Sequence, residues 1–343
     1  MKILVTGTDG YLGCLLAPTL VAEGHEVVGV DTGFYRNGWL YDGLGSIPQT
    51  ISKDMRLLTE DDFEGVDAVV AMAELSNDPT GDLVGEITYD INHGGSVHVA
   101  KTAKAAGVER FVYMSSCSVY GVAEGIVDEN SPINPQTAYA KCKALTEADL
   151  WQLADDNFHP VALRNATAFG ASPRQRFDIV LNNLAGLAWV EKVIAMNSDG
   201  TPWRPMVHAL DIAKAIRTVL AAPLDKVHST YYNVGSFDNN YTVREIAETV
   251  ADEFHGCQLS FGPPSADNRS YKVNFDRIED ALGFTCDWNL AMGAKQLHAV
   301  FETIQLDAET FYGRGHTRLK QIEHLLNTGQ IDRELFWKQV ATV

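Results

Sequence analysis

Two polar side chains, Tyr139 and Lys143, are the strongest candidates for chemistry in this sequence. They lie four residues apart in TAYAKCKALTEADLWQLADD (residues 137–156), a helical pattern that places both on one helix face. A lysine ammonium close to a phenol stabilises the phenolate and lowers its pKa. Such a tyrosine can transfer a proton near neutral pH. Pairs of this kind also occur on solvated helix faces, so the pair gains weight only beside a cofactor that needs a proton partner.

The stretch MSSCSVYG (residues 114–121) combines three serines, a cysteine and a tyrosine at the end of a strand-like run. A cysteine beside serines suggests a nucleophile. The five cysteines of the chain are scattered, and none stands in C-x-x-C spacing. That distribution argues against a disulfide framework and against a zinc site. We therefore expect reduced cysteines and no bound metal.

A glycine-rich turn, TGTDGYLG (residues 6–13), separates the first strand-like run from the first helical pattern. Gly7 can turn tightly after the strand, Gly10 lets backbone amides approach a phosphate, and Gly13 lets the helix pack close to the sheet. The N-terminus of that helix would offer free N–H groups and a positive dipole end to a pyrophosphate. The turn therefore predicts a dinucleotide site.

Asp31 ends the second strand-like run, 18 residues after Gly13. A dinucleotide-binding fold places a carboxylate at this point on the adenosine ribose hydroxyls. Such a carboxylate would repel a 2′-phosphate, and the next arginine, Arg36, is five residues further on. The sequence therefore favours NAD over NADP. The alternative is an aspartate that only ends a strand before a turn.

Short apolar runs alternate with helical patterns over the first 165 residues. The strand-like runs are KILVTG (2–7), HEVVGVD (25–31), DAVVAMA (67–73), ERFVYMSS (109–116) and PVALRNATAFG (160–170). This alternation predicts βαβ units and a parallel sheet that is buried on both faces. The pattern loosens after Gly170, which indicates a smaller second lobe, and the tail from about residue 295 has a mostly helical pattern.

The chain is strongly acidic: 27 Lys and Arg against 45 Asp and Glu give a net charge of −18. A field of this sign repels nucleic acid and anionic membranes, so we expect neither as a partner. An anionic substrate would need a local cluster of arginines. We find no signal-peptide pattern and no run of 18 apolar residues. Together with reduced cysteines, this predicts a cytoplasmic protein.

The TGxxGxxG turn, the strand that ends in serines and the Y-x-x-x-K pair 23 residues after Ser116 together resemble the extended short-chain dehydrogenases/reductases. Over about residues 1–290 the chain is similar to their NAD-dependent nucleotide-sugar epimerases and dehydratases, and in particular to UDP-galactose 4-epimerases. The resemblance implies a Rossmann-type doubly wound parallel sheet (α/β) with a smaller α/β substrate-binding lobe. It also implies NAD as cofactor, a nucleotide-diphosphate sugar as substrate and a homodimer.

The same resemblance divides the chain and assigns roles to its residues. It implies an NAD-binding domain at 1–172 with 208–235 returning to it, a nucleotide-sugar lobe at 173–207 and 236–305, and a helical C-terminal extension at 306–343. The catalytic residues that it implies are Ser116, Tyr139 and Lys143. The implied cofactor-binding residues are Gly7, Gly10, Tyr11, Leu12, Gly13, Asp31, Asp54, Met55, Ala73, Asn92, Ser115, Tyr139 and Lys143. The implied substrate-binding residues are Glu74, Ser116, Thr167, Asn183, Leu184, Arg204, Arg269 and Tyr271.

Several positions depart from the family pattern. Thr167 stands where an asparagine is usual, and the asparagine has moved to Asn165. Arg204 is followed by Pro205 instead of an aspartate. Glu74 stands where a small residue is usual, either as a specificity or acid/base group or as a solvated loop glutamate. Three arginines in loop-like stretches could also reach phosphate, and the last ranks first: Arg174, Arg176 and Arg269.

Oxidation of the sugar at C4 is the shared first step that the resemblance implies. Tyr139 would take the hydroxyl proton, and Ser116 would hydrogen-bond the same oxygen. In the related 4,6-dehydratases an Asp-Glu pair follows the catalytic threonine, whereas Cys117 and Ser118 stand here. The resemblance therefore favours C4 epimerisation, through a transient 4-keto sugar with tightly bound NAD, over dehydration. A net dehydrogenase, a 4-keto reductase and a non-catalytic NAD-binding regulator are the alternatives.

Overall fold

The computed structural model of the chain describes residues 1–43, 45, 48–76, 85–264 and 270–338. Seven strands form its central sheet: β1 (Lys2–Thr6), β2 (Glu26–Asp31), β3 (Thr50–Ser52), β4 (Ala68–Ala71), β5 (Arg110–Ser116), β7 (His159–Asn165) and β11 (Thr230–Val234). Their order is β11-β7-β5-β4-β1-β2-β3, and every neighbouring pair is parallel. The chain runs outward from β1 in both directions, so a crevice opens between β1 and β4 at the carboxyl ends of the strands. The predicted α/β fold with a doubly wound sheet is confirmed.

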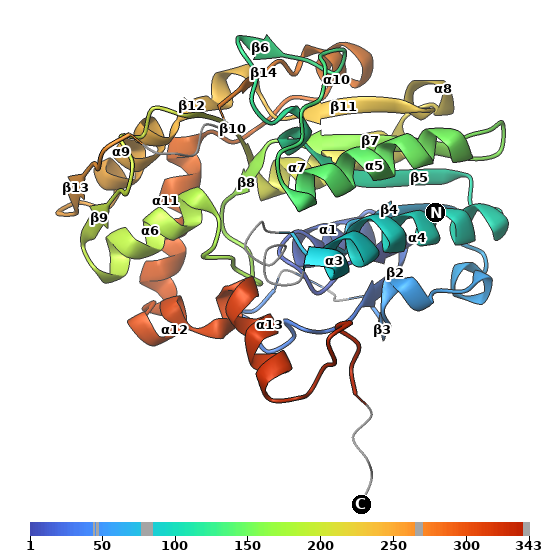
Figure 1. Cartoon of the computed structure of the whole chain (residues 1–343), viewed down its shortest axis with the longest axis horizontal. Coiled ribbons are helices and arrows are strands. Elements are labelled where there is room, and N and C mark those ends of the chain that lie inside the picture. The colour runs from blue at the N-terminus through green and yellow to red at the C-terminus, as the bar shows by residue number, and fades with distance from the viewer. Residues whose placement is uncertain (44, 46–47, 77–84, 265–269, 339–343) are drawn as a thin grey trace, which may run out of the picture.

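Helices cover both faces of this sheet (Figure 1). The four principal ones are α1 (Gly13–Ala22), α4 (Ser96–Ala105), α5 (Ala138–Leu153) and α7 (Ala209–Ala221). α1 contacts α7 on one face, and α4 contacts α5 on the other. Successive side chains of β1 point into opposite cores: Ile3 and Val5 pack with α1 and α7, whereas Leu4 packs with α4 and α5. Burial on both faces is the reason that these strands are almost entirely apolar.

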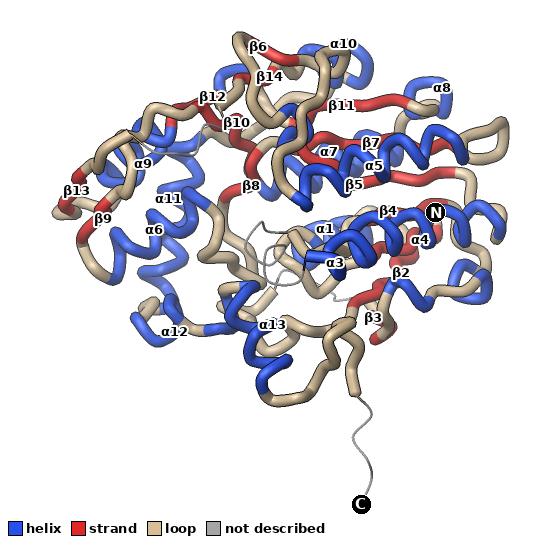
Figure 2. Tube along the Cα trace, viewed as in Figure 1, coloured by secondary structure: helices blue, strands red, loops and turns tan. Residues whose placement is uncertain are grey.

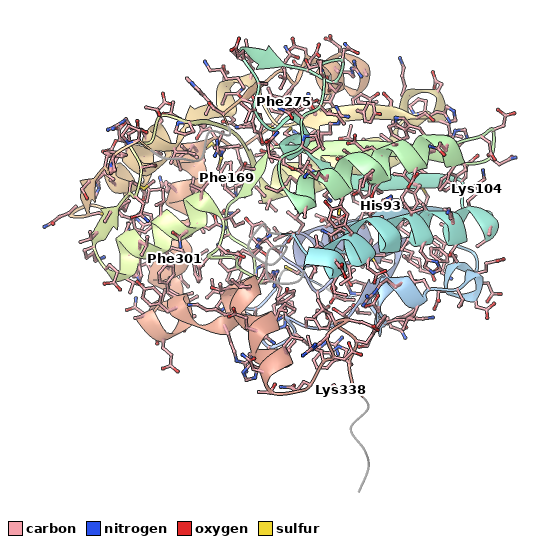
Figure 3. All side chains as sticks on the ribbon, viewed as in Figure 1. His93, Lys104, Phe169, Phe275, Phe301 and Lys338 are labelled. Carbon is pink, nitrogen blue, oxygen red and sulfur yellow. The ribbon has the colours of Figure 1, made fainter. Side chains whose placement is uncertain are left out.

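A second lobe lies beside the carboxyl ends of the central strands, at the left of Figure 2. Its helices and strands are α6 (Val180–Val190), α9 (Val243–Glu253), α11 (Leu290–Ile304), β8 (Thr167–Phe169), β10 (Trp203–His208), β12 (Asn240–Thr242), β9 (Val193–Ala195) and β13 (Gln258–Ser260). The three helices share one apolar core, to which Phe169 and Phe301 contribute (Figure 3). Strand β10 joins β8 in parallel and β12 in antiparallel. The domain boundaries expected from the sequence stay a prediction.

The remaining elements are short and lie around these two parts. They are α3 (Gly85–Thr88), a π-helical turn (Tyr89–Gly95) that continues into α4, β6 (Ile126–Val127), α8 (Leu224–Val227), β14 (Lys272–Val273), α10 (Asp276–Leu282), α12 (Ala308–Tyr312) and α13 (Arg318–Asn327). The C-terminal segment with α13 returns to the β2–β3 edge of the central sheet (Figure 1). In the described part of the chain, no helix combines the length and the apolarity that a membrane crossing requires.

Candidate active site

A cavity of about 480 Å³ lies at the carboxyl ends of the central strands, where the second lobe adjoins the sheet. It is lined by most of the site residues expected from the sequence: Gly7, Gly10, Tyr11, Leu12, Gly13, Asp31, Asp54, Met55, Ala73, Glu74, Ser115, Ser116, Tyr139, Lys143, Thr167, Arg204 and Tyr271. Three other expected residues, Asn92, Asn183 and Leu184, are described by the structure but are not among those that line the cavity. Arg269 lies outside the described residues.

The glycine turn forms the floor of the cavity beside α1. Gly7 has a φ of +82°, which favours glycine, and its N–H donates to Val30 O at 2.7 Å. A Cβ on Gly13 would lie 2.2 Å from Gly7 O, so only glycine lets the helix begin this close to the turn. No side chain caps the N-terminus of α1, so no capping side chain competes with a ligand for the positive end of the helix dipole. The turn therefore fits the phosphates of a dinucleotide.

Asp31 lies at the end of β2, on the cavity wall next to the glycine turn. Its carboxylate accepts hydrogen bonds from the backbone N–H of Gly33 at 2.8 Å and of Asp9 at 3.1 Å. Burial raises the pKa of Asp31, although these two hydrogen bonds act in the opposite direction. Arg36 pairs with Asp9 at 3.4 Å. The wall that would meet the adenosine ribose therefore presents a carboxylate, which suits ribose hydroxyls.

Two of the expected cofactor residues have internal hydrogen-bond partners. The carboxylate of Asp54 receives two side-chain hydrogen bonds from Arg56, at 3.0 and 2.8 Å, while Asp54 and Met55 both line the cavity. Asn92 is fully buried, and its side chain bonds both the N–H and the carbonyl of Leu75, at 2.8 and 2.9 Å. Asn92 therefore holds the loop after β4 in place and reaches the site only through that loop.

Tyr139 and Lys143 lie in the first turns of α5, which Thr137 caps by accepting from the N–H of Ala140 at 3.2 Å. The ammonium of Lys143 lies 5.2 Å from the centre of the Tyr139 ring. Lys143 also donates to the carbonyl of Met114 at the end of β5. The helix cap and the strand end therefore place the ammonium beside the phenol inside the cavity.

Ser116 completes this group from the end of β5. Its hydroxyl accepts from the N–H of Ser118 at 3.1 Å, and it lies near enough to the phenol of Tyr139 to favour the phenolate. Burial raises the pKa of Tyr139, and so does the Glu74 carboxylate, whereas the Lys143 ammonium and the Ser116 hydroxyl lower it. Of the three groups that lower it, Lys143 and Ser116 are the two that the sequence grouped with this tyrosine, and Arg176 is the third.

Glu74 forms a buried ion pair with Lys143, an interaction that sequence reasoning missed. The carboxylate lies 2.6 Å from the ammonium, and the two side chains are only 3% and 4% exposed. Glu74 also accepts from the hydroxyl of Tyr113 at 2.8 Å. Burial raises the pKa of Glu74, while Lys143 counteracts the rise. For Lys143 burial lowers the pKa, but the Glu74 carboxylate outweighs it and the net direction is upward.

Cys117 lies outside the cavity lining and does not fit a nucleophile. The residue is 1% exposed, and its thiol donates to the carbonyl of Arg164 at 3.1 Å. Burial raises the pKa of this thiol far above its usual value, so the reactive thiolate is strongly disfavoured. Tyr120 from the same stretch donates to the side chain of Asn233 at 2.8 Å in the core. Within this stretch the three serines, Ser115, Ser116 and Ser118, line the cavity, whereas Cys117 and Tyr120 do not.

The second lobe supplies the opposite wall. Thr167 from β8, Arg204 from β10 and the buried Tyr271 line the cavity. Asn183 instead donates to the carbonyl of Phe177 at 2.9 Å, and Leu184 packs in the core of the lobe. These two residues of α6 therefore stabilise the lobe and its adjoining loop in this structure.

Two arginines of the loop before α6 take different positions. Arg174 is 2% exposed, donates to the carbonyl of Tyr35 and stacks over Trp39 at 4.1 Å from the ring centre. Burial lowers its pKa to about 10. Arg176 lines the cavity, pairs with Asp178 at 2.8 Å and donates to the hydroxyl of Ser76 at 3.0 Å. Of these two, Arg176 is the one placed to meet a ligand.

Arg318 from α13 also lines the cavity, beside Tyr35. Sequence reasoning did not name it, because the C-terminal extension contains no recognisable motif. A lone arginine at the start of a helical pattern carries no signal of its own. Only the fold brings Arg318 to the cavity, because the extension returns to the β2–β3 edge.

The sequence profile of the NAD dependent epimerase/dehydratase family matches residues 3–235, which is more than half of the chain. The chain belongs to this family. Membership establishes NAD as the cofactor, in agreement with the glycine turn and Asp31 at the end of β2. The resemblance seen in the motifs of the sequence is thereby confirmed at the level of the family.

Three individual proteins that this chain resembles are 22–27% identical to it in sequence. UDP-glucose 4-epimerase of Bacillus subtilis (strain 168) is 27% identical over 277 residues, which cover 72% of this chain and 80% of that protein. MoeE5 in complex with UDP-glucose and NAD is 25% identical with a TM-score of 0.76, covering 89% of this chain and all of that one. DesIV, a dTDP-glucose 4,6-dehydratase from Streptomyces venezuelae with NAD and TYD bound, has a TM-score of 0.77 at 22% identity over 88% of this chain and 97% of that one. A protein solved with UDP-glucose and NAD and a dehydratase therefore share this fold.

Proposed function

We propose that the protein is an NAD-dependent nucleotide-sugar epimerase that inverts C4 through a transient 4-keto sugar, with NAD held tightly. The observation that carries the proposal is the convergence of Ser116, Tyr139 and Lys143 on one cavity with the glycine turn. Bound NAD supplies a hydride acceptor that can return the hydride. The residues around it must bind the sugar, move one proton and keep water out.

Tyr139 is the proton-transfer group in this proposal. In the phenolate form it accepts the proton of the sugar 4-hydroxyl, and it returns that proton when the keto group is reduced. Ser116 hydrogen-bonds the same sugar oxygen and orients it. Lys143 stabilises the phenolate through its positive charge, because its ammonium lies 5.2 Å from the ring centre.

The substrate would be a nucleoside diphosphate sugar, because cations line the cavity of an acidic protein. The net charge of −18 repels anions in general, so a diphosphate needs local positive charge. Arg204 and Arg176 are placed on the wall of the second lobe. A guanidinium can donate two parallel hydrogen bonds to a phosphate.

Dehydration is the weaker candidate, although a dehydratase shares the fold. It needs an acid and a base besides the tyrosine. Cys117 is buried away from the cavity, and Ser118 is not a carboxylate. Glu74 is a cavity-lining carboxylate that acts on Tyr139, but it is engaged with Lys143 and Tyr113. Homodimer formation and a cytoplasmic location stay predictions.

The decisive experiment incubates the NAD-loaded protein with a panel of nucleotide sugars. Epimerisation predicts the C4 epimer by NMR with no change in mass and no lasting absorbance at 340 nm. A stoichiometric rise at 340 nm would replace this proposal by a net dehydrogenase. Loss of 18 mass units, that of one water, would indicate a dehydratase. If NAD is bound but no sugar of the panel is converted, a regulator becomes the better reading.

A further inference from the structure

The C-terminal extension binds the loop that follows Asp31. Gln321 of α13 donates to the carbonyl of Phe34 at 2.7 Å, and Trp337 donates to the carbonyl of Thr32 at 2.7 Å. Ile322 and Leu325 of the same helix pack in one core with Phe34. Figure 3 labels Lys338 of this segment at the bottom of the view. The extension is therefore built into the cofactor side of the cavity, far in sequence from the glycine turn.

Arg318, the first residue of α13, is the one cation that this extension contributes to the cavity lining. The residue is 7% exposed, and its guanidinium lies 3.8 Å from the centre of the Tyr35 ring. None of the described carboxylates lies within ion-pair distance of it. Burial lowers the pKa of Arg318, because the charged form is deprived of water. A buried guanidinium without a carboxylate partner is costly, and an anionic ligand would offset that cost.

The charged groups around Arg318 indicate which anionic group it would bind. Asp31 and Asp178 act on Arg318 to raise its pKa, and Arg176 acts to lower it. Arg176 in turn influences Tyr139 at the catalytic end of the cavity. Arg318 is therefore within electrostatic reach both of the carboxylate expected at the adenosine ribose and of an arginine that acts on Tyr139. In a dinucleotide, the group between the two ribose rings is the pyrophosphate.

Arg318 differs from the neighbouring Arg176 in whether a carboxylate pairs with the guanidinium. Arg176 already pairs with Asp178 at 2.8 Å, whereas none of the described carboxylates pairs with Arg318. The glycine turn offers backbone N–H groups and a helix dipole on the floor of the cavity, but no full positive charge. We propose that Arg318 binds the pyrophosphate of NAD and that the C-terminal extension thereby completes the cofactor site. The proposal rests on NAD binding and is independent of the proposed epimerisation.

The test measures binding by calorimetry to protein freed of NAD, with three ligands and no nucleotide sugar. The ligands are NAD, ADP-ribose and adenosine, of which only the first two contain the pyrophosphate. Arg318→Met removes the charge at similar length. We expect this variant to bind NAD and ADP-ribose more weakly by the same factor, about tenfold to a hundredfold. Its affinity for adenosine should be unchanged.

Lys320→Met is the matched control, since Lys320 is an exposed cation on the same helix that donates to the carbonyl of Tyr312 at 2.8 Å. All three affinities should stay at the wild-type value. Unchanged NAD binding in Arg318→Met would overturn the proposal. An equal loss for adenosine would also overturn it, because the effect would then pass through Tyr35 and not through phosphate.

A second variant covers the case in which Arg318→Met does not fold, as judged by circular dichroism. Arg318→Lys keeps the charge and loses the planar fork that binds phosphate with two hydrogen bonds. We expect a severalfold loss of affinity for NAD and ADP-ribose and no loss of affinity for adenosine. A uniform change across the three ligands, or no change at all, would contradict the proposal here as well.

Discussion

Two buried ion pairs flank the same helix, and only one of them lines the cavity. Lys143 and Glu147 are four residues apart on α5. Lys143 pairs with Glu74 at 2.6 Å, and Glu147 pairs with Arg164 at 2.7 Å. All four side chains are 4% exposed or less. By distance and burial the two pairs are alike.

Their surroundings differ. Glu147 accepts from Ser115 at 2.6 Å and from two nitrogens of Arg164, whose third donor meets Tyr120 at 3.1 Å. The ring of Tyr231 covers the same guanidinium at 4.0 Å. Every strong donor and acceptor of this pair is therefore engaged inside the core. The pair at Lys143 instead adjoins a phenol and an open cavity. Access to the cavity, and not burial or charge, distinguishes the two pairs.

Substitution of Tyr139, at the cavity, is expected to reduce turnover most. We expect Tyr139→Phe to lower turnover by about a hundredfold to ten-thousandfold, because it removes the proton-transfer group and little packing. Turnover is measured with saturating nucleotide sugar, and thermal unfolding checks the fold. Tyr120→Phe is the matched control, since its hydroxyl bonds Asn233 in the core. Comparable turnover for Tyr139→Phe and the wild type would refute the assigned role.

Substitution of Arg164, in the core pair, is expected to reduce folding stability. We expect Arg164→Met to lower the free energy of unfolding by about 3–5 kcal/mol, because it leaves the carboxylate of Glu147 buried without its partner. Turnover per folded molecule should stay near the wild-type value. Denaturant unfolding provides the measurement. The double variant Glu147→Leu with Arg164→Met should recover most of the loss, because the charge and its partner are then both absent. A double variant that is less stable than Arg164→Met would contradict this account.

Glu74→Gln tests whether the two pairs differ in their coupling to Tyr139. The phenol is influenced by Lys143, by Glu74, by the Ser116 hydroxyl and by Arg176, and only the Glu74 carboxylate among these raises its pKa. The neutral amide removes that repulsion, so the pKa of Tyr139 falls. The phenolate is then populated at lower pH, and the rising limb of the pH–rate profile should move to lower pH. Glu147→Gln should leave the limb in place. A shift to higher pH in Glu74→Gln would contradict the sign.

The smallest effect is expected at Cys117, which lies next to Ser116 but in the core. Cys117→Ala should leave turnover within about twofold of the wild type and cost about 1 kcal/mol of unfolding free energy. Wild-type activity should also resist thiol-modifying reagents at this position, because the thiol is 1% exposed. Loss of turnover in Cys117→Ala with an intact fold would restore the nucleophile hypothesis.

Local pattern was sufficient for much of the cofactor half. The glycine turn, the acidic end of β2 and the alternation of strands and helices are features of neighbouring residues, so spacing along the chain reveals them. The helix that carries Tyr139 and Lys143 was likewise predictable, because positions four apart share one helix face. The roles of these residues stay predictions until the variants are measured.

Contacts between distant segments could not be predicted in this way. The sequence showed Glu74 only as an unusual residue after a strand, and the fold brought its carboxylate to Lys143. Asn183 and Leu184 looked like ligand residues, but the fold directs them to Phe177 and to the core of the second lobe.

The sequence by itself therefore determined the fold class, the family, the cofactor and the helix that carries the tyrosine–lysine pair, because each depends on short-range periodicity and on motifs. Only the tertiary structure decided which charges meet. It paired Lys143 with Glu74, enclosed Cys117, and brought Arg318 from the C-terminal extension to the cavity. The physical reason is that ion pairing and burial depend on distances in space, and side chains on separate elements acquire those distances only when the sheet, the second lobe and the extension pack together.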